Sequence, residues 1–247
     1  MFNELQIILH NGKQYIDDPR TARLTEPFRG LPEISTAPVD TDKLVNSCPV
    51  QAIEANPVSI DLGKCTFCGE CAFRFPDKIK FTNKHHLAAN IREDLVVREG
   101  ETKGIKVRKK AIRQEIKGFF KRSLKLRQVC AGGDNSTEFE LGAMGNANFD
   151  MGRYGIEFAA SPRHADGILV TGPITENMAE ALEIAYNAVP EPKVLIVCGV
   201  DAISGGIFSG GEALNREIFS KYKVDLYIPG NPPHPLTILN GILDLIG

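Results

Sequence analysis

The chain has 247 residues, of which 43% are hydrophobic and 24% are charged, and its formal net charge is −2. This length suffices for two modest domains, and the near-neutral balance gives the chain as a whole no reason to bind nucleic acid. No apolar run approaches the roughly 18 residues that a membrane-spanning helix needs, and no secretory signal opens the sequence. We therefore expect a cytoplasmic protein whose six cysteines are thiols or metal ligands rather than disulfides.

The N-terminal part of the sequence divides by composition. Residues 1–40 are rich in proline and aspartate and weakly patterned, which predicts an irregular N-terminal arm with a short strand at Leu5–Leu9. A cysteine-bearing stretch occupies residues 41–82. The polar and charged stretch over 83–102 is expected to be a linker.

Four cysteines in the 41–82 stretch are spaced as in bacterial ferredoxins. Those proteins use the run C-x2-C-x2-C-x3-C-P twice, and the fourth cysteine of one run binds the other cluster. Cys65, Cys68 and Cys71 keep the first three positions of the second run, and Cys48 keeps the fourth position of the first. The other four positions hold Pro38, Thr41, Leu44 and Phe75. One complete set of four thiolates is left, which predicts one [4Fe–4S] cluster in a small α+β ferredoxin-like domain.

A structural zinc site is the alternative for four thiolates. The spacing C-x2-C-x2-C is uncommon for zinc, and the Cys-Pro-x-x-Ala-Ile context that begins at Cys48 is similar to ferredoxins. Gly69 lies within the loop of three cysteines and permits a close approach of the backbone to a cluster. These features favour the iron–sulfur interpretation.

Residues 103–127 form a strongly basic block, with eleven Lys or Arg residues against the single acid Glu115. Apolar residues recur near helical spacing from Ile112 to Leu124, so we predict a basic amphipathic helix here. Such a helix could lie on an anionic membrane or against membrane subunits, and a plain solvated helix is the alternative. No nucleic-acid-binding motif accompanies it, so nucleic acid is not expected as a partner.

From residue 128 to residue 247 the pattern is that of an α/β domain. Short β-branched runs predict buried strands, and longer stretches with one apolar face predict helices. The expected strands are Lys125–Val129, Gly167–Thr171, Val194–Gly199 and Val224–Pro229, and the expected helices are Thr175–Ala188, Ala213–Phe219 and Leu236–Ile246. Alternating strands and helices indicate a parallel sheet covered on both faces.

Several segments of this half resemble the small subunit of energy-converting membrane-bound NiFe hydrogenases, itself similar to the subunit of respiratory complex I that carries cluster N2. The segments occur in the family's order. They are Arg122–Val129, Glu138–Leu141, Arg153–Ile156, Ala160–Asp166, Leu169–Pro173, Ala202–Gly206 and Pro229–Pro235. The resemblance implies a flavodoxin-like parallel-sheet domain over 128–247, preceded by the ferredoxin-like iron–sulfur domain.

The resembled family binds a proximal [4Fe–4S] cluster with four cysteines of its own. In this sequence those four positions hold Asp134, Thr137, Asp201 and Asn231. Carboxylate, hydroxyl and amide oxygens are hard ligands that do not suit an iron–sulfide cube. We therefore expect the proximal cluster to be absent and its site to be degenerate.

Several alternatives stay open around that degenerate site. The turn over 132–137 is expected to be a polar filling of the vacated pocket, although a phosphate or flavin site is the alternative. Cys198 is expected in the core, and Cys130 with Cys198, Asp134 and Asp201 is a less favoured metal site. A separate group of residues is implied by the resemblance as an interface with a large subunit: Arg153, Arg163 and His164.

These expectations define a subunit rather than an enzyme that acts alone. We expect an iron–sulfur electron-transfer or adaptor subunit of a hydrogenase-related or complex-I-like oxidoreductase complex, peripheral on the inner face of the cell membrane. The expected partners are a large-subunit homologue, membrane subunits and other ferredoxin-like subunits. The alternatives are a ferredoxin-linked flavoprotein reductase and a purely structural subunit with a redox-silent cluster.

Overall fold

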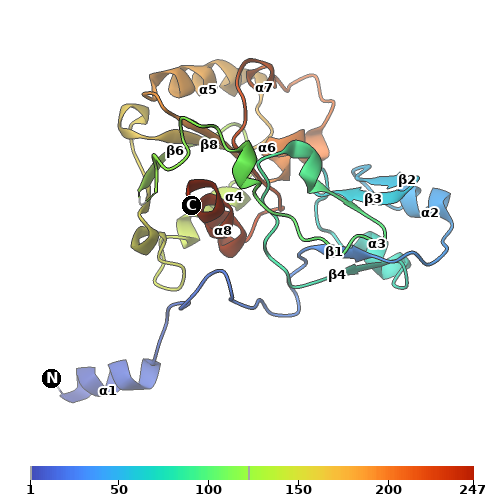
Figure 1. Ribbon diagram of the computed structural model, residues 1–247, viewed down its shortest axis with the longest axis horizontal. Helices are drawn as coiled ribbons and strands as arrows, with labels where there is room; N and C mark the ends of the chain where they lie inside the picture. Colours follow the sequence, from blue (N-terminus) through green and yellow to red (C-terminus); the bar gives the residue numbers. More distant parts are fainter. Residues whose placement is uncertain (1, 122) are drawn as a thin grey trace.

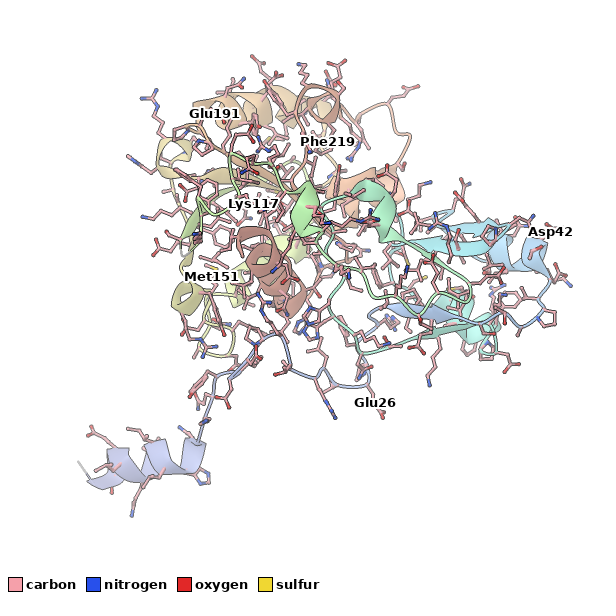
Figure 2. All side chains as sticks on the ribbon, viewed as in Figure 1. Glu26, Asp42, Lys117, Met151, Glu191 and Phe219 are labelled. Carbon is pink, nitrogen blue, oxygen red and sulfur yellow. The ribbon has the colours of Figure 1, made fainter. Side chains whose placement is uncertain are left out.

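The computed structural model describes residues 2–121 and 123–247, which form a smaller N-terminal part and a larger α/β part in contact with each other (Figure 1). A helix, α1 (Phe2–Asn11), stands away from both parts. The strand expected at Leu5–Leu9 is therefore wrong, because these residues lie within this helix. Figure 2 shows the side chains of α1 projecting into open space, whereas side chains fill the contact between the two parts.

The N-terminal part places two short antiparallel sheets around two short helices. Its elements are β1 (Pro32–Ile34), α2 (Thr41–Asn46), β2 (Ile53–Ala55), β3 (Val58–Asp61), α3 (Glu70–Arg74), β4 (Ile79–Phe81), the 3-10 turn η1 (Arg92–Leu95) and β5 (Val96–Arg98). Strand β1 pairs with β4, and β3 pairs with both β2 and β5. Asp40 caps α2 by accepting a hydrogen bond from the backbone of Lys43 at 3.1 Å.

The stretch over 83–102 is packed structure rather than the expected linker. Strand β5 completes the three-stranded sheet, and His85, Leu87 and Ala89 are buried. The ring of His85 donates to the carbonyl of Pro19 at 3.1 Å, so this stretch also fixes the N-terminal arm.

The α/β part is built on a parallel five-stranded sheet with the order β7-β6-β8-β9-β10. Its elements are β6 (Leu124–Cys130), α4 (Ser136–Ala143), η3 (Met151–Tyr154), β7 (Ile156–Phe158), η4 (Pro162–His164), β8 (Gly167–Thr171), α5 (Glu176–Ala188), β9 (Val194–Cys198), α6 (Val200–Ser204), η5 (Gly206–Phe208), α7 (Ile218–Lys221), β10 (Leu226–Ile228) and α8 (Pro235–Ile246). Counted along this part, the strand order is 2-1-3-4-5, which is that of flavodoxin-like domains.

Alternate residues of the central strands face opposite layers. Ile168 and Leu195 belong to the core shared with α5 and α6, whereas Leu169 and Ile196 belong to the core shared with α4 and α8. Both faces of the sheet are therefore covered, as predicted. The helices expected at 175–188 and 236–246 and the strands at 167–171 and 194–199 are confirmed. The helix expected at Ala213–Phe219 is wrong over most of its length, because residues 213–217 are irregular and α7 begins only at Ile218.

The basic amphipathic helix expected over 103–127 is absent from the described residues of that stretch. The chain runs without regular structure to a single 3-10 turn, η2 (Lys109–Ala111), and then through turns into β6. Ile105 and Val107 are buried while Lys106 and Arg108 are exposed. This alternation is that of an extended segment, with every second side chain packed inward.

Backbone and side-chain contacts join the parts. Ala89 and Tyr227 form an antiparallel bridge, each backbone amide donating to the other's carbonyl at 3.0 and 2.8 Å. Arg113 pairs with the buried carboxylate of Asp225 through Nε at 2.7 Å and Nη2 at 2.8 Å. The N-terminal part is thus held against the β10 side of the sheet.

Candidate metal centre

One small cavity brings together the four cysteines that the spacing singled out. Cys48, Cys65, Cys68 and Cys71 all line it, together with an apolar wall that includes Ile53, Ile60 and Phe81. Cys48 follows α2, the other three lie on or beside the turn that enters α3, and the β2–β3 hairpin separates the two groups. The fold therefore brings Cys48 and Cys65, which are 17 positions apart in the sequence, to the same site.

The loop backbone turns amides toward two of the sulfurs. Ala52 donates to Sγ of Cys48 and Phe67 donates to Sγ of Cys65, each at 3.3 Å. Phe67 and Gly69 take positive φ values of 54° and 81°, which fold the cysteine loop tightly. Such N–H···S contacts stabilise negative charge on ligating sulfurs.

The environment disfavours free thiolates at two of these positions. Burial raises the pKa of Cys65 to about 12 and that of Cys71 to about 11, and the neighbouring cysteines add to both shifts. The thiols are therefore protonated at neutral pH unless positive charge enters the cavity. Iron ions would supply that charge, and their binding would release protons.

The donor set fits an iron–sulfur cluster. Four soft sulfur donors, an apolar wall and amide donors are the features such clusters require. In the described part of the chain, no group of three or more His, Cys, Asp or Glu side chains is arranged to hold a metal ion.

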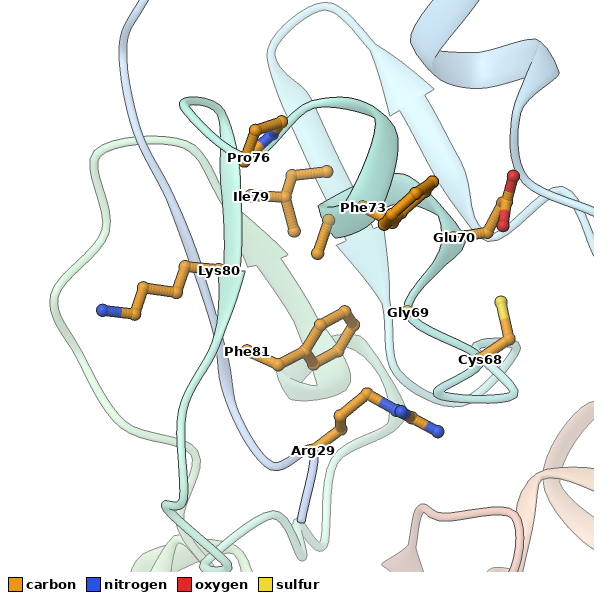
Figure 3. A pocket seen from close by; sticks show the side chains of 10 residues that line it. Arg29, Cys68, Gly69, Glu70, Phe73, Pro76, Ile79, Lys80 and Phe81 are labelled. Atoms are coloured by element: carbon orange, nitrogen blue, oxygen red, sulfur yellow. The ribbon is translucent and has the colours of Figure 1, made fainter. Parts of the chain in front are cut away.

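The site opens to the surface on one side. Cys68 is exposed, whereas Cys65 and Cys71 are buried. Arg29 lies beside this opening, and its Nε donates to the carbonyl of Phe67 within the cysteine loop. Figure 3 shows the guanidinium of Arg29 directed toward the loop that carries Cys68. Sequence reasoning missed Arg29, because the two residues of this contact are 38 positions apart.

The four residues that the resemblance aligns with cluster cysteines lie at the carboxyl ends of the sheet strands. Asp134 and Thr137 follow β6, Asp201 follows β9 and Asn231 follows β10. Burial raises the pKa of Asp201, and the nearby carboxylates of Asp134 and Glu138 add to that shift. The site lies beside the point where the strand order reverses, between β6 and β8, where flavodoxin-like domains bind ligands.

Polar contacts within this second site satisfy much of its hydrogen bonding. Asp134 accepts from the backbone and the hydroxyl of Ser136 at 2.9 and 2.6 Å, which lowers the pKa of its carboxyl group. Glu138 accepts from the hydroxyl of Thr171. These polar side chains therefore bond to one another, while the expected polar filling of a vacated pocket stays a prediction. Glu138 was not singled out as a site residue, although it directly follows the Thr137 position.

The two remaining cysteines differ in their surroundings. Cys198 ends β9 and is fully buried in the core with α4 and α8, as expected of a core residue. Cys130 ends β6 and is partly buried, and burial with a hydrogen bond to Glu138 raises its pKa. Neither belongs to the cavity of the four N-terminal cysteines.

The three residues implied as an interface have separate surroundings. Arg153 donates to the carbonyl of Ile16 at 2.7 Å, and its guanidinium lies over the rings of Tyr15 and Tyr154. It therefore holds the N-terminal arm. Arg163 and His164 are exposed on η4.

The parallel sheet defines the larger part as a flavodoxin-like domain, and comparisons with known proteins relate that part to subunits of redox complexes. Residues 130–245 match the family described as NADH ubiquinone oxidoreductase, 20 Kd subunit. An uncharacterised protein of Methanocaldococcus jannaschii is 41% identical over 125 residues, covering 51% of this chain and 84% of that protein. A probable membrane-bound hydrogenase subunit of Pyrococcus furiosus is 35% identical over 125 residues, covering 51% and 75%.

Two further matches extend the comparison. An NADH-quinone oxidoreductase subunit of Citrifermentans bemidjiense is 42% identical over 106 residues, covering 43% of this chain and 62% of that protein. A chain in the solved structure of the membrane-bound sulfane sulfur reductase, an archaeal respiratory membrane complex, is 30% identical with a TM-score of 0.46, covering 51% and 70%. The chain belongs to the family of the 20 kDa subunit of NADH:ubiquinone oxidoreductase. The matched family region begins at Cys130, so the four N-terminal cysteines lie outside it.

Proposed function

We propose that the chain is an iron–sulfur electron-transfer and adaptor subunit of a membrane-associated complex related to hydrogenases and complex I. It carries one [4Fe–4S] cluster in a ferredoxin-like domain and a degenerate proximal site in its flavodoxin-like domain. The observation that carries the proposal is the single cavity lined by Cys48, Cys65, Cys68 and Cys71 in a chain of this family.

The chain's own residues perform three tasks at the cluster site. The four sulfurs hold the cluster, and the amides of Ala52 and Phe67 stabilise negative charge on two of them. The apolar wall with Ile53 and Ile60 limits the access of water. When bound, the cluster supplies a one-electron relay.

The second site is proposed to have lost its relay. Asp134, Thr137, Asp201 and Asn231 replace the cysteines of the resembled family, and oxygen donors do not suit an iron–sulfide cube. Asp134, Glu138 and Asp201 concentrate carboxylates there, which disfavours a flavin phosphate. Electrons from the N-terminal cluster then leave through its own surface rather than through this domain.

The proposed partners are a large-subunit homologue and membrane subunits. The Pyrococcus relative is described as a subunit of a membrane-bound hydrogenase. Within the described residues, no helix is both long and apolar enough to cross a bilayer. A peripheral position on the inner face of the membrane, held by membrane subunits, is consistent with that finding.

Iron and acid-labile sulfide per chain, with EPR of the dithionite-reduced protein, test the proposal. About four of each, with the signal of one reduced cluster, is the expected result. About eight of each would overturn the degenerate site, and none would overturn the cluster. Stoichiometric flavin would instead support the reductase alternative.

A further inference from the structure

A shallow hollow borders the exposed edge of the cysteine cavity. Its wall includes Arg29, Cys68, Phe73, Pro76 and Lys80 (Figure 3). Cys68 is the cysteine of the motif that lines this hollow, and it is exposed, whereas Cys65 and Cys71 are buried. Any cluster held by the four thiols is therefore nearest to solvent at this hollow.

Part of the wall of the hollow is apolar. Phe73 is 84% exposed, the largest exposed fraction among the large hydrophobic residues of the described chain. Phe73 lies on α3, two residues after Cys71, and Pro76 is also part of the wall. An aromatic side chain so exposed contributes little to the core, and exposed aromatic residues are typical of contact sites.

The rim of the hollow carries uncompensated positive charge. Arg29 and Lys80 are exposed, and neither has an ion-pair partner among the described residues. Glu70, the one acid of the wall, is already paired with Arg74. The surface around the exposed cluster edge is therefore basic although the whole chain carries a net charge of −2.

We propose that this hollow docks a small acidic iron–sulfur electron carrier. Acidic side chains of the carrier would pair with Arg29 and Lys80, and an apolar contact would form on Phe73. One electron would pass from the reduced carrier to the oxidised cluster, so the carrier is oxidised and the cluster reduced by one electron without transfer of atoms. The inference rests on the proposed function, because an electron carrier docked in the hollow can transfer an electron only if the cluster is present beside it.

The test uses a strongly acidic two-cluster bacterial ferredoxin as the probe and the whole chain loaded with iron and sulfide. Its binding is measured by isothermal titration calorimetry at several salt concentrations, and electron transfer from the reduced probe by stopped-flow absorbance. Lys80→Glu with Arg29→Glu is expected to weaken binding about tenfold or more and to flatten its salt dependence. Phe73→Ser is expected to weaken binding severalfold with the salt dependence unchanged.

A matched control and the iron content separate the outcomes. The single variant Lys80→Glu is compared with Lys223→Glu, which makes the same change of charge at an exposed lysine of the α/β part and is expected to leave binding unchanged. Equal losses in these two single variants would overturn the docking site. The docking site would also be overturned if the chain bound phosphatidylglycerol vesicles but not ferredoxin, and if the Arg29→Glu and Lys80→Glu changes abolished this vesicle binding. A chain without iron and sulfide would refute the proposed function itself, whereas a loaded chain that ignores the probe refutes only the inference.

Discussion

At the scale of single residues, the cysteine cavity combines backbone amides that stabilise thiolates with burial that opposes thiolate formation. Burial raises the pKa of Cys65 and Cys71, while the amides of Ala52 and Phe67 point to sulfur. Such a site is poised for a cation rather than for free thiolates. The proposed function requires a metal cluster to complete this cavity.

Replacing Cys65 with serine removes one of the two most buried ligands, so we expect the chain to lose most of its iron and sulfide. Cys130→Ser is the matched control, since Cys130 lies outside the cavity. It should retain the full complement. Iron and sulfide analysis of both purified variants checks this, and equal retention in both would contradict the ligand assignment.

His234 makes the free energy of unfolding depend on pH below neutrality. The ring packs edge-on against Phe28 and Phe149, and burial lowers its pKa to about 4, with a smaller effect of His85. An unfolded histidine titrates near pH 6.5, so the unfolded state binds the proton first as pH falls. The contribution of neutral His234 is complete above about pH 6.5 and is lost as pH falls toward about 4.

We expect the free energy of unfolding to fall by about 1–3 kcal/mol between pH 7 and pH 4.5 through this residue. His234→Asn keeps a side-chain acceptor for the amide of Leu236, which His234 caps through Nδ1 at 3.1 Å, but does not titrate. Urea denaturation at both pH values should show a smaller loss in this variant. An unchanged loss would mean that carboxylates alone set the acid sensitivity.

At the scale of elements, local patterns predicted the buried strands and the long helices. Runs such as Gly167–Thr171 and Val194–Cys198 are buried along their whole length, so their hydrophobicity alone identifies them as buried strands. The stretch over 103–127 shows where this reasoning fails. Its apolar residues near helical spacing also suit an extended path, and distant partners decide between the two.

Arg113 is one such partner. Its guanidinium binds Asp225, 112 positions away, and also donates to the carbonyl of Lys193. Asp225 additionally accepts from the amide of Leu195 at 3.0 Å, and its side chain is only 2% exposed. Like charges along a lysine-rich segment oppose a helix, so these tertiary bonds determine its path.

We expect Arg113→Met to destabilise the fold by about 3 kcal/mol, because it leaves the buried carboxylate of Asp225 without its cation. The double variant Arg113→Met with Asp225→Asn should recover much of that loss. Chemical denaturation of both variants measures the difference. A loss below about 1 kcal/mol in the single variant would show that solvent compensates Asp225.

At the scale of the whole molecule, the sequence predicted two folded parts but not how they join. The cysteine spacing and the strand pattern are local features, whereas the contacts of Ala89 with Tyr227 and of Asn240 with Pro19 join residues far apart in the chain. The same limit applies to the second site: Asp134 and Asp201 were singled out from family motifs, whereas the contact of Thr171 with Glu138 joins residues 33 positions apart and was missed.

The contacts between the two parts predict that both parts unfold cooperatively. One hydrophobic core includes Leu44 and Ile60 of the N-terminal part together with Leu195 of the sheet. We expect the loss of cluster absorbance and the loss of helical circular dichroism to coincide along a urea titration. Two transitions separated by more than about 1 M urea would contradict a shared core.

The bridge between Ala89 and Tyr227 also has a consequence for self-association. Strand β10 is the outermost strand on its side of the sheet, and unpaired amides at such an edge recruit strands from other molecules. Ala89 occupies that edge with two backbone hydrogen bonds. A chain cut back to residues 124–247 keeps the whole of β6, would uncover this edge and is expected to form aggregates that the full chain does not. The N-terminal part thus covers the edge strand β10 within the same molecule and keeps it from pairing with other chains.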